Sequence, residues 1–357
     1  MPAADRRLPL VPAFDVIING TPMATEARAH IISIAVDHSN DLPSMFTLEM
    51  VDSIALNQEV TWIDDPDLLN IGNLVEIKLG YADKLATLMI GEITGVEPEF
   101  AFDQATRLIV RGYDRRHRLQ RGRKTRTFVQ QKDSDIASQI ASDAGLTPQI
   151  EDSGTVYDYI LQSNQTDLDF LQSRARNIQY EVAVDDKTLL FRPVANAGSA
   201  VMTLTMADDL LEFRPRLASA GQVSEVTVRS WSPKDKKELV GQAKVGDEVS
   251  TMGGQSSAGA LVESAFGAAV ALVSGQPVMT QAEADQLAKA CFNSVALELI
   301  TGEGECWGRT DLRAGIVIQI DGVGKRFSGQ YYVTSTIHRY APPRGYITQF
   351  TIQRNAS

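Results

Sequence analysis

The search for chemistry in this sequence begins with its histidines, which are His30, His38, His117 and His338. None of them has a cysteine or glutamate at a spacing typical of a metal site. His38 follows Asp37 in a polar segment before Pro43, and a turn explains both residues without a catalytic role. His338 ends a predicted strand, which favours a hydrogen-bonded structural histidine over a metal ligand.

The two cysteines, Cys291 and Cys306, are too few for a disulfide framework or a four-cysteine zinc site. Cys291 falls on the apolar face of a helix expected over residues 280–300, which favours packing in the core. A disulfide with Cys306 is the alternative. The reducing cytosol, where we expect the chain to be made, argues against that bond.

Motifs of nucleotide binding and nucleophilic catalysis are incomplete. Residues 322–326 (Gly-Val-Gly-Lys-Arg) contain the glycines of a phosphate loop, but the Gly-Lys-Ser/Thr ending is missing and strands are expected on both sides. We therefore expect a hairpin turn there. No Gly-x-Ser-x-Gly sequence occurs. Adjacent carboxylates such as Asp64 and Asp65 are common in acidic chains and do not indicate a glycosidase. We expect no catalytic residue, no metal and no cofactor.

The strongest compositional anomaly is the basic stretch, residues 111–126. It holds eight of the 34 lysines and arginines and one acid, Asp114, whereas the rest of the chain has 26 basic and 44 acidic residues. Three interpretations are open: nucleic-acid contact, a protein interface, or pairing with the chain's own carboxylates. The net charge of −11 and the few aromatics in the stretch disfavour nucleic acid.

We expect the basic stretch to form a subunit or partner interface, because clustered arginines pair well with carboxylates. The residues expected at this interface are Arg111, Arg115, Arg116, Arg118, Arg121, Arg123, Lys124 and Arg126. Changing three of the five arginines between 115 and 123 to glutamate is expected to abolish assembly and to leave the isolated fold intact. Internal pairing is the alternative.

Composition is that of an ordinary globular protein. The chain has 357 residues, 43% hydrophobic and 22% charged, which excludes wholesale disorder and predicts about two domains, or more if they are small. No apolar run approaches the roughly 18 residues that span a bilayer. Residues 1–7 carry charge with no hydrophobic segment after them, so we expect no secretory signal.

Period-two alternation predicts β structure at both ends of the chain, and a helical period appears between them. Capping residues predict helices over 133–141, from Thr166 onward, and over 280–300. Residues 246–276 are rich in Gly, Ser and Ala and are predicted to be a flexible or partner-ordered loop.

The expected fold class is mainly β with α+β inserts, built from two similar antiparallel β-barrels and small helical α+β domains. The predicted boundaries are 1–113 for the first barrel, 114–199 for an α+β insert, 200–245 for the first part of the second barrel, 246–302 for a loop and helix insertion, and 303–357 for the completion of that barrel.

Four segments in a fixed order carry a family resemblance that covers residues 10–355. Val110–Leu119 and its continuation to Ala137 resemble the first-barrel exit of phage late control gene D proteins. Gln162–Leu171 is similar to a helix-opening motif that these proteins share with VgrG spike proteins. Trp231–Lys234 with Gly241–Ala243 is a further match. The second-barrel motif is matched by Gly302–Gly304, Leu312–Gly315, Phe327–Val333 and His338–Tyr340.

The resemblance implies a non-enzymatic baseplate hub of a contractile phage tail or tail-like injection system. Such a hub is a homotrimer that presents two tube-facing barrels per chain to a hexameric inner tube. Its partners are the inner tube protein, the spike protein and baseplate or wedge proteins, with no nucleic acid, and with no membrane in the resting particle. The hub is assembled in the cytoplasm and becomes part of the particle.

Two other functions stay open from the residues alone. One is a cell-wall hydrolase at a tail tip, which needs an acidic pair in a cleft. The other is a nucleic-acid-binding module that uses the basic stretch. VgrG relatives continue into an oligonucleotide/oligosaccharide-binding barrel and a β-helical needle, whereas this sequence stops at Ser357. The resemblance therefore implies either a separate spike protein or a longer natural chain.

Overall fold

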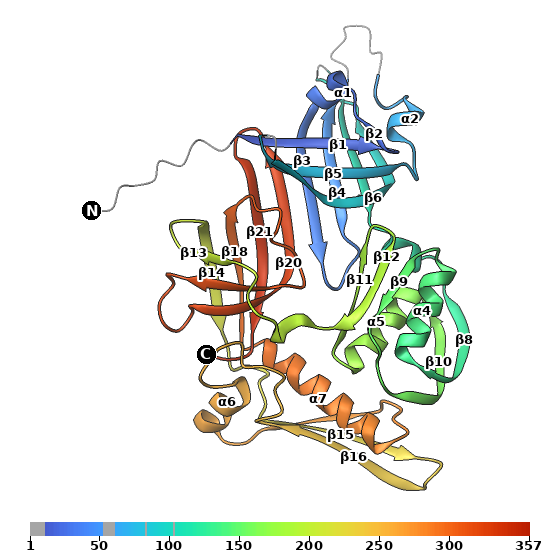
Figure 1. Ribbon diagram of the computed structural model, residues 1–357, viewed down its shortest axis with the longest axis vertical. Helices are drawn as coiled ribbons and strands as arrows, with labels where there is room; N and C mark the ends of the chain where they lie inside the picture. Colours follow the sequence, from blue (N-terminus) through green and yellow to red (C-terminus); the bar gives the residue numbers. More distant parts are fainter. Residues whose placement is uncertain (1–10, 53–60, 83, 103) are drawn as a thin grey trace. The chain divides into compact units, whose positions relative to one another are not determined.

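A computed structural model describes residues 11–52, 61–82, 84–102 and 104–357. The chain divides into two compact units (Figure 1). Unit 1 comprises residues 1–117, 306–313 and 336–349, and unit 2 comprises residues 118–305, 314–335 and 350–357. The first ten residues of the predicted 1–113 domain lie outside the described residues.

Unit 1 is built on an antiparallel sheet. Its strands lie in the spatial order β3-β4-β7-β6-β5-β1-β2. In β4, Phe46, Leu48 and Met50 are fully buried while the residues between them are half-buried, as period-two alternation requires. The strands are β1 (Pro12–Ile18), β2 (Thr21–Pro22), β3 (Ile31–Ser39), β4 (Met45–Val51), β5 (Leu74–Tyr81), β6 (Lys84–Glu99) and β7 (Arg107–Tyr113). Its short helices are α1 (Thr25–Ala29) and α2 (Pro66–Leu69), and α3 (Arg116–Leu119) begins in unit 1 and ends in unit 2.

The first part of unit 2 is an α+β region. Strands β8 and β10 form an antiparallel ribbon, and β11, β12 and β9 form a second sheet. The predicted cap of α5 is confirmed, because Thr166 Oγ1 accepts a hydrogen bond from the Asp169 amide at 3.1 Å. The elements are β8 (Lys124–Lys132), α4 (Asp133–Asp143), β9 (Thr147–Ile150), β10 (Val156–Gln165), α5 (Asp167–Asn177), β11 (Tyr180–Asp185), β12 (Thr188–Pro193) and the 3-10 turn η1 (Ala195–Ala197).

The second β region departs from the predicted boundaries. Residues 225–244, expected in the second barrel, form β15 (Glu225–Ser232) and β16 (Lys237–Lys244) of a separate sheet, completed by β17 (Val270–Ser274). Helix α7 (Gln281–Leu297) lies along one face of that sheet (Figure 1) and shares a hydrophobic core with it. The prediction of a loop over 246–276 is wrong, since it contains β17 and α6 (Ala258–Phe266), which Ser257 caps.

The remaining strands run through the end of the chain. They are β13 (Thr203–Thr205), β14 (Leu210–Leu217), β18 (Ile300–Trp307), β19 (Val317–Asp321), β20 (Gly329–Ala341) and β21 (Gly345–Arg354). Their spatial order is β13-β19-β20-β21-β18-β14.

The same topology occurs twice among the described strands. The first strand set, β1, β3, β4, β5, β6 and β7, lies in the order β1-β5-β6-β7-β4-β3. Numbered along the chain, that order is first, fourth, fifth, sixth, third, second. The second strand set, β13, β14 and β18 to β21, follows the identical order. One difference is that β1 pairs antiparallel with β5, whereas the short β13 pairs parallel with β19.

Two glycines from the resembling motifs allow close contact between strands. A Cβ atom added to Gly112 on β7 would lie 2.3 Å from the Phe46 ring of β4, and one added to Gly304 on β18 would lie 2.3 Å from the Phe350 ring of β21. Each aromatic ring thus fills the space that a side chain would occupy on the neighbouring strand.

Candidate interaction sites

The basic stretch is divided between the two units. Residues 111–117 belong to unit 1 and residues 118–126 to unit 2. The eight residues expected at one interface therefore come from two different folding units, and each half has its own set of partners.

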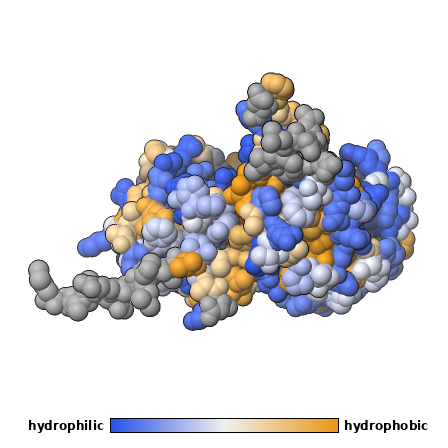
Figure 2. Space-filling model, turned by 90° about the horizontal axis from the view of Figure 1, so that it is seen from above, coloured by the Kyte–Doolittle hydropathy of each residue, from blue (hydrophilic) through white to orange (hydrophobic). Residues whose placement is uncertain are grey.

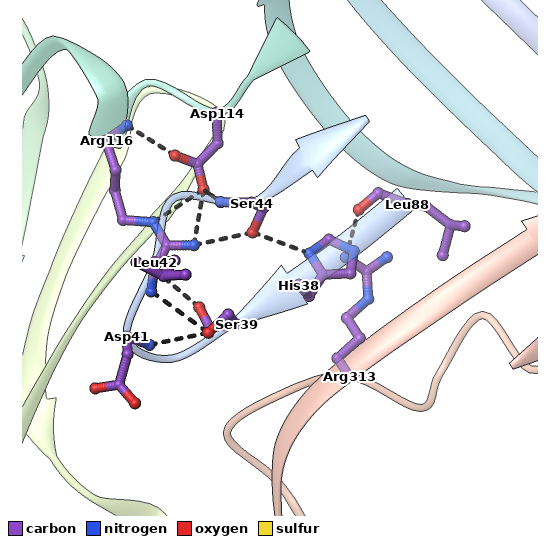
Figure 3. A network of polar contacts seen from close by, with 9 residues as sticks. All are labelled: His38, Ser39, Asp41, Leu42, Ser44, Leu88, Asp114, Arg116 and Arg313. Carbon is purple, nitrogen blue, oxygen red and sulfur yellow. Dashed lines mark hydrogen bonds and ion pairs between the residues drawn. The ribbon is translucent and has the colours of Figure 1, made fainter. Parts of the chain in front are cut away.

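In unit 1, Arg116 is buried in a network of polar contacts (Figure 3). Only 3% of Arg116 is exposed. Its guanidinium donates to Asp114 Oδ2 at 2.9 Å, to the Ser39 carbonyl at 3.0 Å and to Ser44 Oγ at 2.9 Å. Asp114 Oδ2 also accepts the Ser44 amide hydrogen at 2.8 Å. The network joins the end of β3, the start of β4 and the residues after β7, so it holds these three segments together.

The neighbouring basic residues also have carboxylate partners within unit 1. Arg115 Nε lies 3.6 Å from Glu92 Oε1, and His117 Nε2 lies 3.1 Å from Glu92 Oε2. Arg111 Nε donates to Glu97 Oε1 at 2.9 Å. The internal-pairing alternative thus describes Arg115 and Arg116. A glutamate at either position would place like charge beside a buried carboxylate. For these two residues we therefore predict that such a change destabilises the fold, which differs from the expectation from the sequence.

A pair of histidines adjoins the Arg116 network. His38 lies in β3 and not in the turn that the sequence suggested. His38 Nδ1 is 3.2 Å from Ser44 Oγ, and its ring meets that of His338 edge-on, with centroids 5.7 Å apart. His338 is fully buried, and its Nδ1 is 2.8 Å from the Tyr346 hydroxyl, as a structural histidine requires.

Both histidines are neutral at pH 7. Loss of hydration, with the nearby charge of Arg313, lowers the pKa of His338 to about 3. The pKa of His38 is also well below its usual value, because of loss of hydration first and then its electrostatic interactions with His338, Arg313 and Arg116. The Arg313 guanidinium donates to the Leu88 carbonyl at 2.9 Å, and Figure 3 shows Arg313 beside His38.

In unit 2, the basic stretch pairs with another segment that the sequence singled out. Lys124 Nζ and Arg126 Nη2 each lie 2.7 Å from the Asp167 carboxylate. Arg126 Nε donates to Gln162 Oε1 at 2.8 Å, and Gln162 Nε2 donates to Asp167 Oδ1 at 2.9 Å. Gln162 and Asp167 are buried. Two separate motifs, 111–126 and 162–171, thus form one polar network, a link that spacing along the chain does not reveal.

The exposed members of the stretch are fewer than predicted. Arg118, Arg121, Arg123 and Lys124 are exposed, and Arg123 Nη1 donates to the Asn164 carbonyl at 2.8 Å. Nucleic-acid binders typically neutralise about 6–10 phosphates. With five of the eight basic side chains engaged by carboxylates of their own unit, the nucleic-acid interpretation loses its main support.

Several smaller predictions can be compared with the geometry. Both cysteines are free, so the disulfide alternative is wrong, and burial raises the pKa of Cys291. Gly322 and Gly324 have φ of 80° and 81° in the turn between β19 and β20, as a hairpin requires. Within the described residues, no group of three histidine, cysteine or acidic side chains is placed to hold a metal ion. No described helix is long and apolar enough to cross a membrane.

Sequence reasoning missed the exposed apolar strand faces. Val129 on β8 lies directly opposite Tyr159 on β10, and these residues are 60% and 52% exposed. Leu161 extends this face of the ribbon. Neighbouring apolar pairs such as Phe128–Val129 and Ile160–Leu161 were the available signal, because one residue of each pair must point away from the core. Hydrophobic residues are scattered between hydrophilic ones on the face drawn in Figure 2.

Three solved structures share this fold over most of their length. The 43 kDa tail protein of prophage MuSo2 from Shewanella oneidensis has a TM-score of 0.71 at 13% identity, covering 96% of this chain and 98% of the other. A tail protein from Neisseria meningitidis has a TM-score of 0.70 at 14% identity, with 96% and 97% covered. An E. coli component of the type VI secretion system, described as similar to bacteriophage tail proteins, has a TM-score of 0.59 at 12% identity, with 92% and 74% covered.

These neighbours establish a mainly β fold of the kind found in phage tail and type VI secretion proteins. No curated protein matches the chain. The family model described as the Alg8 N-terminal domain matches residues 10–341, and its name differs from that of the late control gene D family that the motifs resemble. The chain therefore belongs to the Alg8 N-terminal domain family.

Proposed function

We propose that the chain is a non-enzymatic structural hub subunit in the baseplate of a contractile phage tail or a tail-like injection system. It forms a homotrimer that joins the hexameric inner tube to the trimeric spike. The observation that carries this proposal is the repeated six-strand topology within one chain.

A closed ring of six tube subunits needs six equivalent contacts, and a trimeric spike needs three. A trimer provides three chains for the spike. Because each chain has two copies of one strand topology, the trimer also provides six such copies for the tube. The fold that the chain shares with tail proteins over nearly its whole length supports the proposal.

The tube-facing elements in this proposal are the first strand set and the second strand set. The strands of the second set come from residues 203–217 and 300–354. These ranges replace the second-barrel boundaries that were expected from the sequence. The α+β region and the β15–β17 sheet are then available for the spike protein and for baseplate or wedge proteins. We place assembly in the cytoplasm, with the hub remaining in the finished particle.

Co-purification with an inner tube protein from the same genome tests the proposal. Native mass spectrometry should find three hub chains with six tube subunits, and a reconstruction should place both strand sets against the tube. Gly304→Val, which displaces the Phe350 ring in the second set, should weaken tube binding, whereas the exposed Arg121→Met should not. One hub chain per tube subunit, or contact through one strand set only, would show that the chain is not this adaptor.

A further inference from the structure

A cavity of about 560 Å³ lies within unit 2, among helix α5, the turn η1, strand β17 and helix α7. Its volume is within the range of about 300–1,000 Å³ that is typical of ligand pockets. The lining combines aliphatic side chains with four carboxamides, which belong to Asn177, Gln179, Asn196 and Gln276. Within the part of the chain that the structure describes, none of these four side chains makes a hydrogen bond. The cavity therefore has several donors and acceptors that the fold does not use.

Asn196 is the most informative of the four residues, because only 4% of it is exposed. Buried side-chain amides are normally hydrogen-bonded, and burial without a partner is unfavourable. The side-chain amide of Asn196 has no partner among the described residues, and Asn196 lines the cavity. The cavity is therefore the place where a ligand can satisfy its donor and its acceptor.

The lining favours an uncharged ligand with peptide groups. Among the described lining residues there is no aspartate or glutamate, and the one charged residue, Arg176, already has an interaction within the chain. A carboxamide has both an acceptor oxygen and a donor NH₂ group, so it can pair with the N–H and the C=O of a peptide group. A nucleobase typically stacks on an aromatic ring. The one aromatic ring in the described lining, that of Tyr180, already packs against Phe191, with centroids 5.1 Å apart.

We propose that this cavity binds a short, uncharged peptide segment of a partner protein. The carboxamides pair with peptide groups of the segment, and an aliphatic side chain of the segment packs against Val273 and Val295. The longest uncharged segment of this chain, residues 264–282, includes β17 and lines the cavity itself through Val273 and Gln276. We therefore place the bound segment on another protein. The cavity lies outside both strand sets, so the proposal does not depend on the hub role.

Cys291 provides a reporter inside the cavity. It is half-buried in the lining, whereas Cys306 is fully buried. Because burial raises the pKa of Cys291, alkylation with iodoacetamide is run at about pH 9, where more of the thiol is ionised. A bound segment should slow the alkylation of Cys291 in the full chain, as mass spectrometry can measure. Unmodified Cys306 verifies that the protein is folded.

The probe is the blocked peptide acetyl-Ser-Val-Gly-Val-Ser-amide, and isothermal titration calorimetry measures its binding independently of Cys291. One control peptide is methylated at every backbone nitrogen, and a second has Asp in place of both Val. Asn196→Leu removes the buried carboxamide, and Gln276→Leu does the same at an exposed position, where folding is not at risk. Gln139→Leu, exposed on α4 and outside the lining, is the matched control.

We expect saturable binding of the probe that protects Cys291, and loss of both effects for the two control peptides. Asn196→Leu and Gln276→Leu should each weaken binding at least about tenfold, and Gln139→Leu should change it by less than about twofold. Equal binding of the methylated peptide, no binding up to about 1 mM, or wild-type affinity in both lining variants overturns the proposal. Protection of Cys291 by adenosine or maltose but not by the peptide also overturns it. So does a dimer in sedimentation that Gln276→Leu abolishes, because a second copy is then the occupant.

Discussion

Replacing Arg116 by methionine distinguishes the two interpretations of the basic stretch. A partner contact predicts a stable isolated chain that fails to assemble, whereas an internal ion pair predicts local unfolding. Methionine keeps much of the side-chain length and removes the guanidinium from Asp114, Ser39 and Ser44. Asp114 then retains its bonds from the backbone amides of Ser44 and residue 116 but loses the buried guanidinium of Arg116.

The expected cost follows from burial of the pair. The side chains of Arg116 and Asp114 are 3% and 5% exposed, so water screens them little. Removing one partner of a buried ion pair costs about 3–5 kcal/mol, because the remaining charge is left uncompensated. A loss of stability of this size raises the population of locally opened molecules by about 10²–10⁴-fold. Adding Asp114→Asn should recover part of the loss, since the uncompensated charge disappears.

Hydrogen exchange followed by mass spectrometry measures the effect in the full chain. Amides of β3, β4 and β7 should exchange faster by the stated factor, while those of α4 and α5 should stay as in the wild type. Arg121→Met, at an exposed position, is the control and should change stability by less than about 0.5 kcal/mol. Wild-type exchange in Arg116→Met together with lost assembly would refute the structural role and restore the interface interpretation.

Three further predictions concern other parts of the chain. An unfolded histidine binds a proton near pH 6.5, whereas folded His338 does so only near pH 3. The free energy of unfolding of unit 1 should therefore fall by about 2 kcal/mol between pH 7.5 and pH 5 because of His338, and the lowered pKa of His38 acts in the same direction. An unchanged urea midpoint over this pH range would contradict the prediction. Gly304→Val should cost about 1–3 kcal/mol by overpacking against Phe350, and Phe350→Ala in the same chain should relieve the clash, as thermal unfolding can measure. Asp167→Asn should destabilise the α+β region by about 1–3 kcal/mol through loss of its two basic partners, with faster exchange in α5 and none of this effect in β3.

Local patterns in the sequence predicted much of the secondary structure. Thr166 and Thr280 could be identified as helix caps because capping is a local interaction. Each threonine hydroxyl accepts a hydrogen bond from the amide three residues later, at Asp169 and Glu283. Alternation placed β4 correctly because one face of the strand is buried. The helix of residues 258–266 was missed, since a Gly- and Ser-rich segment precedes it and Ser257 was not considered as a cap.

Long-range pairing explains the larger errors. Residues 225–244 alternate as any strand does, and nothing in them indicates that they join β17 and not the second strand set. The Ser44–Asp114 bond connects residues 70 positions apart, so the burial of Arg116 could not be inferred from its neighbours in sequence. An arginine cluster on an acidic chain looks like an exposed surface unless its partners are known.

Each strand set contains a contact between a glycine and a phenylalanine on neighbouring strands, but the two residue types occupy opposite strands in the two sets. This exchange is one reason why no sequence repeat is visible. In each set the third and sixth strands are neighbours. In the first set the third strand supplies Phe46 and the sixth supplies Gly112, directly opposite in the register. In the second set the third strand supplies Gly304 and the sixth supplies Phe350. The geometry of the pair is preserved while the residue types change places, so the equivalence of the sets lies in the backbone. In the hub that we propose, corresponding positions of the two sets would meet identical tube subunits with different side chains. Substitutions at matched positions should therefore have unequal effects on tube binding.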